Sequence, residues 1–310
     1  MTNARWQRWM VLCNLLLTAG WLVWQWPASP VRALLGLAAA MLLLRLFMGL
    51  QFVAMARVNG CAHRADLGGG LPAPSLGQLL RAWSAEARWA GVVFGWWQPF
   101  RHNALPDWLP AASADGPAPA RGVVLVHGFL CNRGFWTPWM KVLRSRGHPF
   151  VAVTLEPAFG SIDDYVDTLD EAVRRVTAAT GRPPVVVGHS MGGLAVRAWM
   201  RARPADARVH RVITLGSPHH GAWAARYSRS ANGRQMVRGG EWLRQLAHDE
   251  PAGRRALFTC FYSNCDNAVY PTATAMLDGA DNRFVPGLAH VHMAFHPPVV
   301  RACLDIIAAP

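Results

Sequence analysis

The chain has 310 residues, of which 52% are hydrophobic, and its formal net charge at pH 7 is +13. This length allows one large α/β domain with an additional segment. The basic residues are scattered arginines rather than a cluster, which argues against a nucleic-acid partner and leaves an anionic membrane surface or composition bias as explanations.

Residues 1–57 are predicted to form a two-helix membrane anchor. Two apolar runs, 10–26 and 31–55, are separated by a break at two prolines. Each is close to the ~20 apolar residues that span a bilayer, and tryptophans near the ends of the first run are typical of a membrane interface. Arg45 is costly at mid-bilayer, so either its side chain reaches the interface or the second helix continues as a surface helix. A cleaved signal peptide is the alternative for the first run, but no small-x-small cleavage motif follows it.

Arginines flank the two apolar runs. Arg5 and Arg8 precede the first run, Arg57 and Arg64 follow the second, and only Arg32 lies in the connection. The positive-inside rule then places both ends of the anchor in the cytoplasm. We therefore expect residues 1–57 to contact membrane lipids and the remaining chain to lie on the cytoplasmic side.

Residues 58–120 form a predicted connector with one amphipathic helix. Apolar residues recur at near-helical spacing over 75–94, and Ser75 is a suitable N-cap. This helix can lie on the bilayer or on the domain that follows, and the sequence does not separate the two. The stretch 111–120, rich in Ala, Pro, Ser and Gly, is predicted to be a linker.

From residue 121 to 310, strand-like apolar runs alternate with helical segments. The predicted strands are 122–127, 150–155, 184–188, 209–215, 257–262 and 282–286. The predicted helices are 136–146, 162–179, 191–203, 298–307 and a segment within 233–247. This alternation predicts an α/β fold, with a mostly parallel sheet flanked by helices on both faces and functional groups at the C-terminal ends of the strands.

A tight turn follows the strand 184–188. Its β-branched residues end at Gly188, and Ser190, Gly192 and Gly193 follow before a helical apolar pattern. In this G-x-S-x-G spacing, a strained turn presents the serine hydroxyl clear of the sheet, and glycines let the helix pack closely behind it. The helix start would direct N–H groups and its positive dipole end at the reacting centre. An incidental serine in a Gly-rich turn is the alternative, but the strand–turn–helix context favours Ser190 as a nucleophile.

Four motifs in this order resemble those of the α/β-hydrolase superfamily, and within it the bacterial triacylglycerol lipases and esterases. They are Val126-His127-Gly128-Phe129, Gly188-His189-Ser190-Met191-Gly192-Gly193-Leu194, Thr214-Leu215-Gly216-Ser217-Pro218-His219-His220-Gly221, and Tyr262-Ser263 followed by Asp266. Segment 287–295 is similar to the histidine loop of this family. The resemblance covers 121–310 and implies an α/β-hydrolase fold. The first antiparallel strands of the full fold are not visible, which implies a sheet reduced at its N-terminal edge.

The resemblance also implies a catalytic triad. A serine hydroxyl needs a base to remove its proton, and the base needs an acid to orient it. In this family the chain order is serine, acid, histidine. The predicted acid is Asp266, in the loop after strand 257–262, with Asp278 and Asp281 as rivals.

The predicted base is His290, which falls on the histidine of the family. Its main competitor, His292, lies two residues later, and His296 is a third candidate. His127 precedes the nucleophile and is therefore expected to be structural. The predicted oxyanion donors are the backbone N–H groups of Phe129 and Met191.

Residues 219–256 are predicted to form an insertion above Ser190. Apolar residues alternate there with arginines, as in a lid that meets a lipid surface. A helical insertion that packs against the domain without any gating role is equally compatible with this pattern.

The six cysteines contain no C-x-x-C pair, and no His/Cys cluster has the spacing of metal ligands. We expect no metal and no organic cofactor. Cys260 and Cys265 could be bridged in an oxidising compartment, and free thiols are the alternative.

These observations predict a serine hydrolase tethered to a bacterial-type inner membrane, which cleaves carboxylic esters of lipids, acylglycerols or small acyl esters through an acyl-enzyme. Acyl transfer or thioester cleavage by the same triad is an alternative, because water and an alcohol acceptor would use one site. A catalytically dead membrane scaffold is the third, and the complete Ser190, Asp266 and His290 set argues against it.

Overall fold

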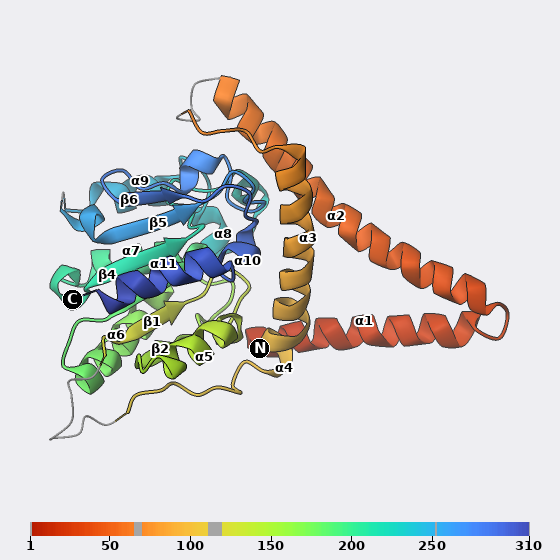
Figure 1. Cartoon of the computed structure of the whole chain (residues 1–310), viewed down its shortest axis with the longest axis horizontal. Coiled ribbons are helices and arrows are strands. Elements are labelled where there is room, and N and C mark those ends of the chain that lie inside the picture. Colours follow the sequence, from red (N-terminus) through yellow and green to blue (C-terminus); the bar gives the residue numbers. More distant parts are fainter. Residues whose placement is uncertain (1, 65–69, 111–119, 252, 310) are drawn as a thin grey trace.

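A six-stranded parallel sheet forms the centre of the computed structural model, which describes residues 2–64, 70–110, 120–251 and 253–309 (Figure 1). The strands are β1 (Val123–Val126), β2 (Phe150–Ala152), β3 (Val185–His189), β4 (Arg211–Leu215), β5 (Phe258–Tyr262) and β6 (Asp281–Phe284). Their order is β2-β1-β3-β4-β5-β6, and all neighbours are parallel. The predicted α/β class and parallel sheet are confirmed.

The sheet ends at β2. Among the described residues, β2 gains one further partner through an isolated antiparallel bridge between Trp108 and Phe150, whose backbone groups exchange hydrogen bonds of 3.0 and 2.9 Å. This bridge covers the edge without adding a strand, and it leaves fewer backbone groups open to edge-to-edge pairing. The predicted linker that follows, 111–120, lies outside the described residues except for its last position.

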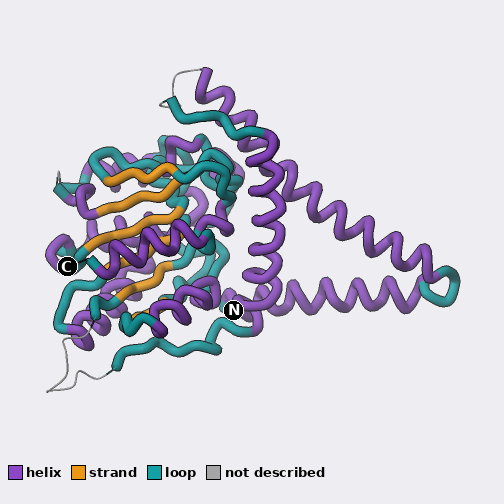
Figure 2. Tube along the Cα trace, viewed as in Figure 1, coloured by secondary structure: helices purple, strands orange, loops and turns teal. Residues whose placement is uncertain are grey.

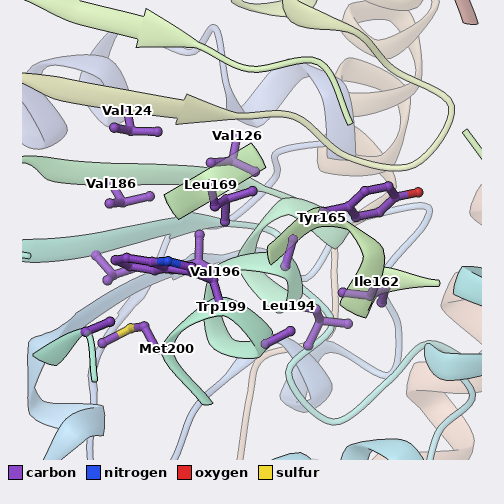
Figure 3. Close-up of a cluster of buried hydrophobic side chains, with 14 of the residues drawn as sticks. Val124, Val126, Ile162, Tyr165, Leu169, Val186, Leu194, Val196, Trp199 and Met200 are labelled. Carbon is purple, nitrogen blue, oxygen red and sulfur yellow. The ribbon is translucent and has the colours of Figure 1, made fainter. Parts of the chain in front are cut away.

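Helices α6 (Val166–Thr180) and α7 (Met191–Ala202) cover one face of the sheet. Their apolar sides pack on Val124 and Val126 of β1 and on Val186 of β3 (Figure 3). Trp199 of α7 is fully buried in this layer, and its indole N–H donates a hydrogen bond of 2.9 Å to Asp170 of α6. The two helices are therefore fixed to one another as well as to the sheet.

Helices α5 (Thr137–Ser145) and α11 (Pro297–Ala308) cover the opposite face. There they meet Val123 and Leu125 of β1 and Val187 of β3. Successive strand residues point to opposite faces, and both faces are buried, which explains why these strands are continuously apolar in the sequence.

Shorter elements connect the main ones. They are η2 (Arg133–Trp136), η3 (Ile162–Tyr165), η4 (Asp206–Arg208), η5 (Trp223–Tyr227), α8 (Ala231–Gln235), α9 (Glu241–His248), η6 (Arg254–Leu257), η7 (Thr272–Ala275) and α10 (His290–Met293).

Two long helices extend from the sheet domain and meet at their far ends: α1 (Asn3–Gln25) and α2 (Pro30–Arg64) (Figure 2). The predicted pair of membrane-spanning helices is corrected here. Within the described residues, one segment is long and apolar enough to cross a bilayer, 30–62 in α2. Helix α1 is less apolar than this segment, because its tryptophans and Asn14 lower its mean hydropathy. At its start, Asn3 and Gln7 are buried against the sheet domain.

The apolar part of α2 is open to its surroundings, and only 6% of its most apolar window is buried. The C-terminal half of α2 is different, since Phe52 and Met55 are buried against Tyr270 and Cys265 of the sheet domain. Helix α2 thus projects an apolar segment while its other end belongs to the fold.

Helix α3 (Leu76–Val92) continues through a π-helical turn, η1 (Val93–Trp97), into the short α4 (Gln98–Phe100). Ser75 caps its start through a reciprocal capping box with Gln78, as the N-cap prediction required. The helix lies on the sheet domain, across the ends of the strands (Figure 1), which settles the alternative that the sequence left open. It does not stop near residue 94, because the helical hydrogen bonds pass Gly95.

The insertion 219–256 packs on the helix α7 side of the domain. Trp242 donates a hydrogen bond of 2.8 Å to Asp163, and Leu243 and Leu246 join the core. Arg197 of α7 forms a fully buried ion pair with Glu250, in which Nε and Oε1 are 2.6 Å apart. These contacts attach α9 and the residue Glu250 that follows it to the domain.

Candidate active site

Ser190 occupies a strained turn between β3 and α7. Its backbone has φ 54° and ψ −128°, a conformation that non-glycine residues rarely adopt. The Ser190 N–H donates a hydrogen bond of 2.9 Å to the Leu215 carbonyl at the end of β4. The turn is therefore tied to the neighbouring strand, and the serine is placed at the carboxyl edge of the sheet.

Glycines around Ser190 allow the backbone to approach closely. A Cβ atom on Gly192 would lie 2.4 Å from the Val126 carbonyl oxygen, and one on Gly128 would lie 2.7 Å from Cβ of Ser190. A side chain at either position would push α7 or the loop after β1 away from the serine. These two glycines thus permit the tight strand–turn–helix geometry on which the G-x-S-x-G prediction depends.

Asp266 and His290 form a buried pair beside this turn. Nδ1 of His290 lies 2.9 Å from Oδ2 of Asp266, and both residues are buried. The other carboxylate oxygen, Oδ1, accepts hydrogen bonds of 2.9 and 2.8 Å from the N–H groups of Ala268 and Val269. Both oxygens are thus occupied, which fixes the orientation of the carboxylate and of the imidazole that faces it.

Gly216 brings this pair next to the serine turn. It follows Leu215, the residue that accepts the Ser190 N–H, and it has φ +56°. A Cβ on Gly216 would lie 2.7 Å from Oδ2 of Asp266 and 3.2 Å from Nδ1 of His290. The end of β4 is therefore flanked by the serine turn, which is bonded to Leu215, and by the Asp266–His290 pair, which packs against Gly216.

The rivals of Asp266 and His290 have other partners. Asp281 is half-exposed and pairs with Arg283 at 2.8 Å. His292 contributes its backbone N–H to another carboxylate, while burial, and then the charge of His296, lower the pKa of its imidazole to about 4. The structure brings His290, and not His292, to Asp266.

The protonation of His290 is biased by its acidic neighbours. Burial by itself lowers the pKa of His290, but the charge and hydrogen bond of Asp266, with a further contribution from Glu86, raise it above its ordinary value. The His189 ring lies beside that of His290, with ring centroids 4.6 Å apart and the ring planes tilted by 48°, and burial keeps the pKa of His189 well below the usual range. A neutral His189 therefore adds little positive charge beside His290.

The loop after β1 lies against the nucleophile turn through Gly128. Within the described parts of the chain, neither the Phe129 N–H nor the Met191 N–H donates a hydrogen bond to another residue. Met191 is the first residue of α7, so its N–H belongs to the unsatisfied group at a helix start. Both N–H groups remain available, as the oxyanion prediction requires.

Side chains from the N-terminal helices hold this loop in place. Gln7 of α1 donates a hydrogen bond of 2.7 Å to the carbonyl of Leu130, a residue that itself has φ 56°. Asn3 of α1 donates to the carbonyl of Cys131, and Gln98 of α4 accepts the Asn132 N–H at 2.6 Å. The conformation of the loop thus depends on residues far outside the sheet domain in sequence.

Glu86 of α3 holds the histidine loop in a similar way. Its carboxylate is buried and accepts hydrogen bonds from the N–H groups of Val291, at 3.1 and 3.0 Å, and His292, at 3.0 Å. Burial raises the pKa of Glu86, with the charge of His290 opposing this. Glu86 was not predicted to contact the site. In the sequence it is simply an acidic residue in an amphipathic helix.

Replacing Glu86 by alanine should destabilise the protein. The change leaves two buried N–H groups at the start of α10 unpaired, which costs about 1–3 kcal/mol in the free energy of unfolding. Glu86→Gln keeps an acceptor oxygen, so its free energy of unfolding should fall clearly less than that of Glu86→Ala. Urea unfolding of the full chain in detergent, followed by circular dichroism, measures both. An alanine variant as stable as the wild type would contradict this account of Glu86.

His127 is structural, as expected. Its Nδ1 donates to the Gly128 carbonyl at 2.8 Å, and its Nε2 accepts the Leu155 N–H at 2.9 Å. Burial lowers the pKa of His127 to about 4, so it stays neutral and connects the loops after β1 and β2. Cys260 and Cys265 are buried free thiols, the second of the two alternatives for these residues.

A parallel sheet with a strained serine after β3 and an Asp–His pair after later strands defines a hydrolase-like α/β protein. The chain belongs to the alpha/beta hydrolase family, whose model matches residues 123–307. No curated protein matches the sequence significantly.

Solved structures of lipases share this fold. The mature form of the Bacillus licheniformis lipase BlEst2 superposes with a TM-score of 0.57 at 18% identity, covering 66% of this chain and 100% of that one. Aspergillus fumigatus lipase B gives a TM-score of 0.52 at 18% identity, covering 64% of this chain and 55% of that one. About a third of this chain therefore has no counterpart in mature BlEst2.

Proposed function

We propose that this protein is a serine hydrolase of carboxylic esters. The observation that carries the proposal is the buried 2.9 Å pair of Asp266 and His290 beside the strained turn of Ser190. His290 takes the proton of the serine hydroxyl as Ser190 attacks the acyl carbonyl. The N–H groups of Phe129 and Met191 stabilise the oxyanion.

The reaction then proceeds in two stages. The ester C–O bond breaks, the leaving alkoxide takes the proton from His290, and the acyl group stays on Ser190. Water next attacks the acyl-enzyme, again with His290 as the base, and the carboxylic acid leaves. Asp266 holds His290 in the tautomer that presents a free Nε2 and stabilises the imidazolium formed at each stage.

We propose further that the enzyme works at a membrane, on lipid esters. In support of this, the segment 30–62 of α2 is long and apolar enough to cross a bilayer, and only 6% of its most apolar window is buried. A removable leader is disfavoured because the other end of the same helix belongs to the fold. Asn59 of α2 accepts the Thr272 N–H at 2.9 Å. Gln51 of α2 accepts a hydrogen bond from the side-chain amide of Asn267, whose Oδ1 in turn accepts the His290 N–H.

A substrate panel with the full chain in detergent or vesicles tests the reaction class. We expect labelling of the protein by a fluorophosphonate and turnover of p-nitrophenyl esters from acetate to palmitate. Thioesters and added acceptor alcohols, assayed in parallel, distinguish ester hydrolysis from thioester cleavage and acyl transfer. A folded wild-type protein that is neither labelled nor active on any ester would refute the proposal.

The rate should rise with pH through the titration of His290. The imidazole accepts the serine proton only when neutral, and its carboxylate neighbours Asp266 and Glu86 raise its pKa above about 6.5 in the free enzyme. We therefore expect kcat/KM for p-nitrophenyl acetate to fall below this pH region and to reach half its plateau above pH ~6.5. A midpoint clearly below that value would contradict the arrangement of His290 between two carboxylates.

A further inference from the structure

A cavity of about 610 Å³ lies between α1, α2 and α3, and all of its lining residues except Leu130 precede the part of the chain that matches the family. Figure 1 shows the three helices enclosing a triangle beside the sheet domain, and residues from all three line the cavity. Its size is within the roughly 300–1,000 Å³ of ligand pockets.

The walls of the cavity are almost wholly apolar. Met41, Leu44 and Met48 contribute from α2, and Phe94 closes it from the side of α3. The segment of α2 that forms one wall is the same segment that is apolar enough to enter a bilayer. Such a cavity suits a hydrocarbon chain that arrives from the membrane.

The cavity has one cationic side chain, Arg45. No described carboxylate lies within ion-pair distance of its guanidinium. An arginine in an otherwise apolar helix near a bilayer is costly unless an anion accompanies it. Since the chain offers no partner among the described residues, a phosphate of the lipid itself is the fitting counter-ion.

The inner end of the cavity reaches the loop that we assign to the oxyanion. Leu130 lines the cavity, and its neighbour Phe129 is one of the two proposed oxyanion donors. Trp6, also in the cavity wall, contacts Phe159 with ring centroids 6.2 Å apart, and Phe159 contacts Phe129 at 6.0 Å. Apolar contacts are thus continuous from the cavity to the loop beside Ser190.

We propose that this cavity takes up an acyl chain of an anionic membrane phospholipid, with the phosphate of that lipid on Arg45. The inference rests on the proposed ester hydrolysis and specifies its substrate class. The bound lipid presents its carboxylic ester to Ser190, and hydrolysis releases a fatty acid and a lysophospholipid.

A cavity-filling variant tests the proposal. A Cβ on Gly91, in the cavity wall, meets no atom within 4 Å, so Gly91→Phe fills the space without a clash at its root. Gly20 of α1 is equally open and does not line the cavity, so Gly20→Phe is the matched control. Neither change is expected to weaken its helix, because glycine is a poor helix former.

Gly91→Phe should lower the hydrolysis of dipalmitoylphosphatidylglycerol in vesicles at least tenfold, because displacing two methylene groups from an apolar site already costs about that factor. Its hydrolysis of p-nitrophenyl acetate, whose acetyl group is too short to fill the cavity, should fall far less than its hydrolysis of the phospholipid, and Gly20→Phe should leave both activities unchanged. Equal phospholipid turnover in the two variants would overturn the proposal.

Arg45→Gln tests the phosphate contact separately. The wild type should hydrolyse dipalmitoylphosphatidylglycerol faster than dipalmitoylglycerol when each is dispersed in micelles of the same non-ionic detergent, and Arg45→Gln should lose this preference. Wild-type preference retained in Arg45→Gln would overturn the assignment of Arg45.

A binding measurement separates this inference from the proposed reaction. In the Ser190→Ala background, native mass spectrometry should detect retained phosphatidylglycerol, and Gly91→Phe should abolish this retention. Retention without any ester turnover by the wild type would support the cavity and refute the reaction. Absence of retention in the Ser190→Ala protein would overturn the cavity.

Discussion

Replacing Ser190 by alanine should abolish ester hydrolysis and fluorophosphonate labelling. The hydroxyl is the only group of the proposed triad that forms a bond to the acyl carbon, and losing the nucleophile of such a triad costs on the order of 10⁶ in kcat. Alanine keeps the Cβ that lies against Gly128, and the backbone hydrogen bond to Leu215 does not involve the side chain. The variant should therefore fold like the wild type.

Ser217→Ala is a matched control for this experiment. Its buried hydroxyl has no hydrogen-bond partner among the described residues, although it lies close to Gly193 at the start of α7. This variant should retain labelling and turnover. Hydrolysis that survives in folded Ser190→Ala protein would remove Ser190 from the mechanism, and loss in both variants would indicate damage to the turn rather than to the nucleophile.

The central strands of the sheet could be predicted because they are buried on both faces. Residues 123–126 of β1 and 185–187 of β3 are continuously apolar and rich in valine, and a turn follows each strand. The serine turn was equally visible, because close packing requires glycine at fixed positions around Ser190. These features are local, so a single sequence contains them.

The supports of the site could not be predicted, because their partners are distant along the chain. Gln7 contacts Leu130, and Glu86 contacts Val291, more than a hundred residues away in each case. Gln7 and Glu86 are polar residues within helices, and a polar residue in a helix ordinarily indicates a position that faces the solvent. What sequence analysis described as an anchor and a connector therefore also shapes the loops beside the serine.

The sequence favoured His290 over His292 through its resemblance to the family's histidine loop, but it could not show the contact that separates the two. The two residues lie two positions apart in the short helix α10, so their side chains point in different directions. Which of them meets Asp266 depends on the orientation of α10, and Glu86 fixes that orientation by binding the N–H groups of Val291 and His292. A helix outside the family region thus helps to hold α10 in this orientation, together with Asn267, which accepts the His290 N–H.

The hydropathy pattern predicted two membrane-spanning helices, whereas one segment of the described chain is apolar enough to span a bilayer. Two apolar runs of similar length precede the sheet domain, yet the first turns of α1 are buried against that domain through Asn3 and Gln7. Asn3 and Gln7 precede the first apolar run, and in the structure they bind the loop after β1. The contacts of Asn3 and Gln7 with the loop after β1 show that the start of α1 is part of the folded domain.

Replacing Asp266 by asparagine should lower kcat by about 10⁴, because it would reverse the tautomer of His290. Oδ1 of Asp266 accepts two N–H groups, from Ala268 and Val269, so the amide oxygen of asparagine must occupy that position. Its NH₂ group then faces Nδ1 of His290, so Nδ1 has to accept a hydrogen bond instead of donating one. Nε2 of His290 becomes the protonated nitrogen and can no longer take the proton of Ser190.

The pH dependence of this variant separates a tautomer effect from simple loss of structure. Removing the charge that raises the pKa of His290 should move the midpoint of the residual rate to lower pH than in the wild type. Asp281→Asn, which alters the exposed acid paired with Arg283, should leave both the rate and the midpoint unchanged. If Asp281→Asn were the inactive variant, the acid would lie on β6, and the 2.9 Å contact between Asp266 and His290 would have only a structural role.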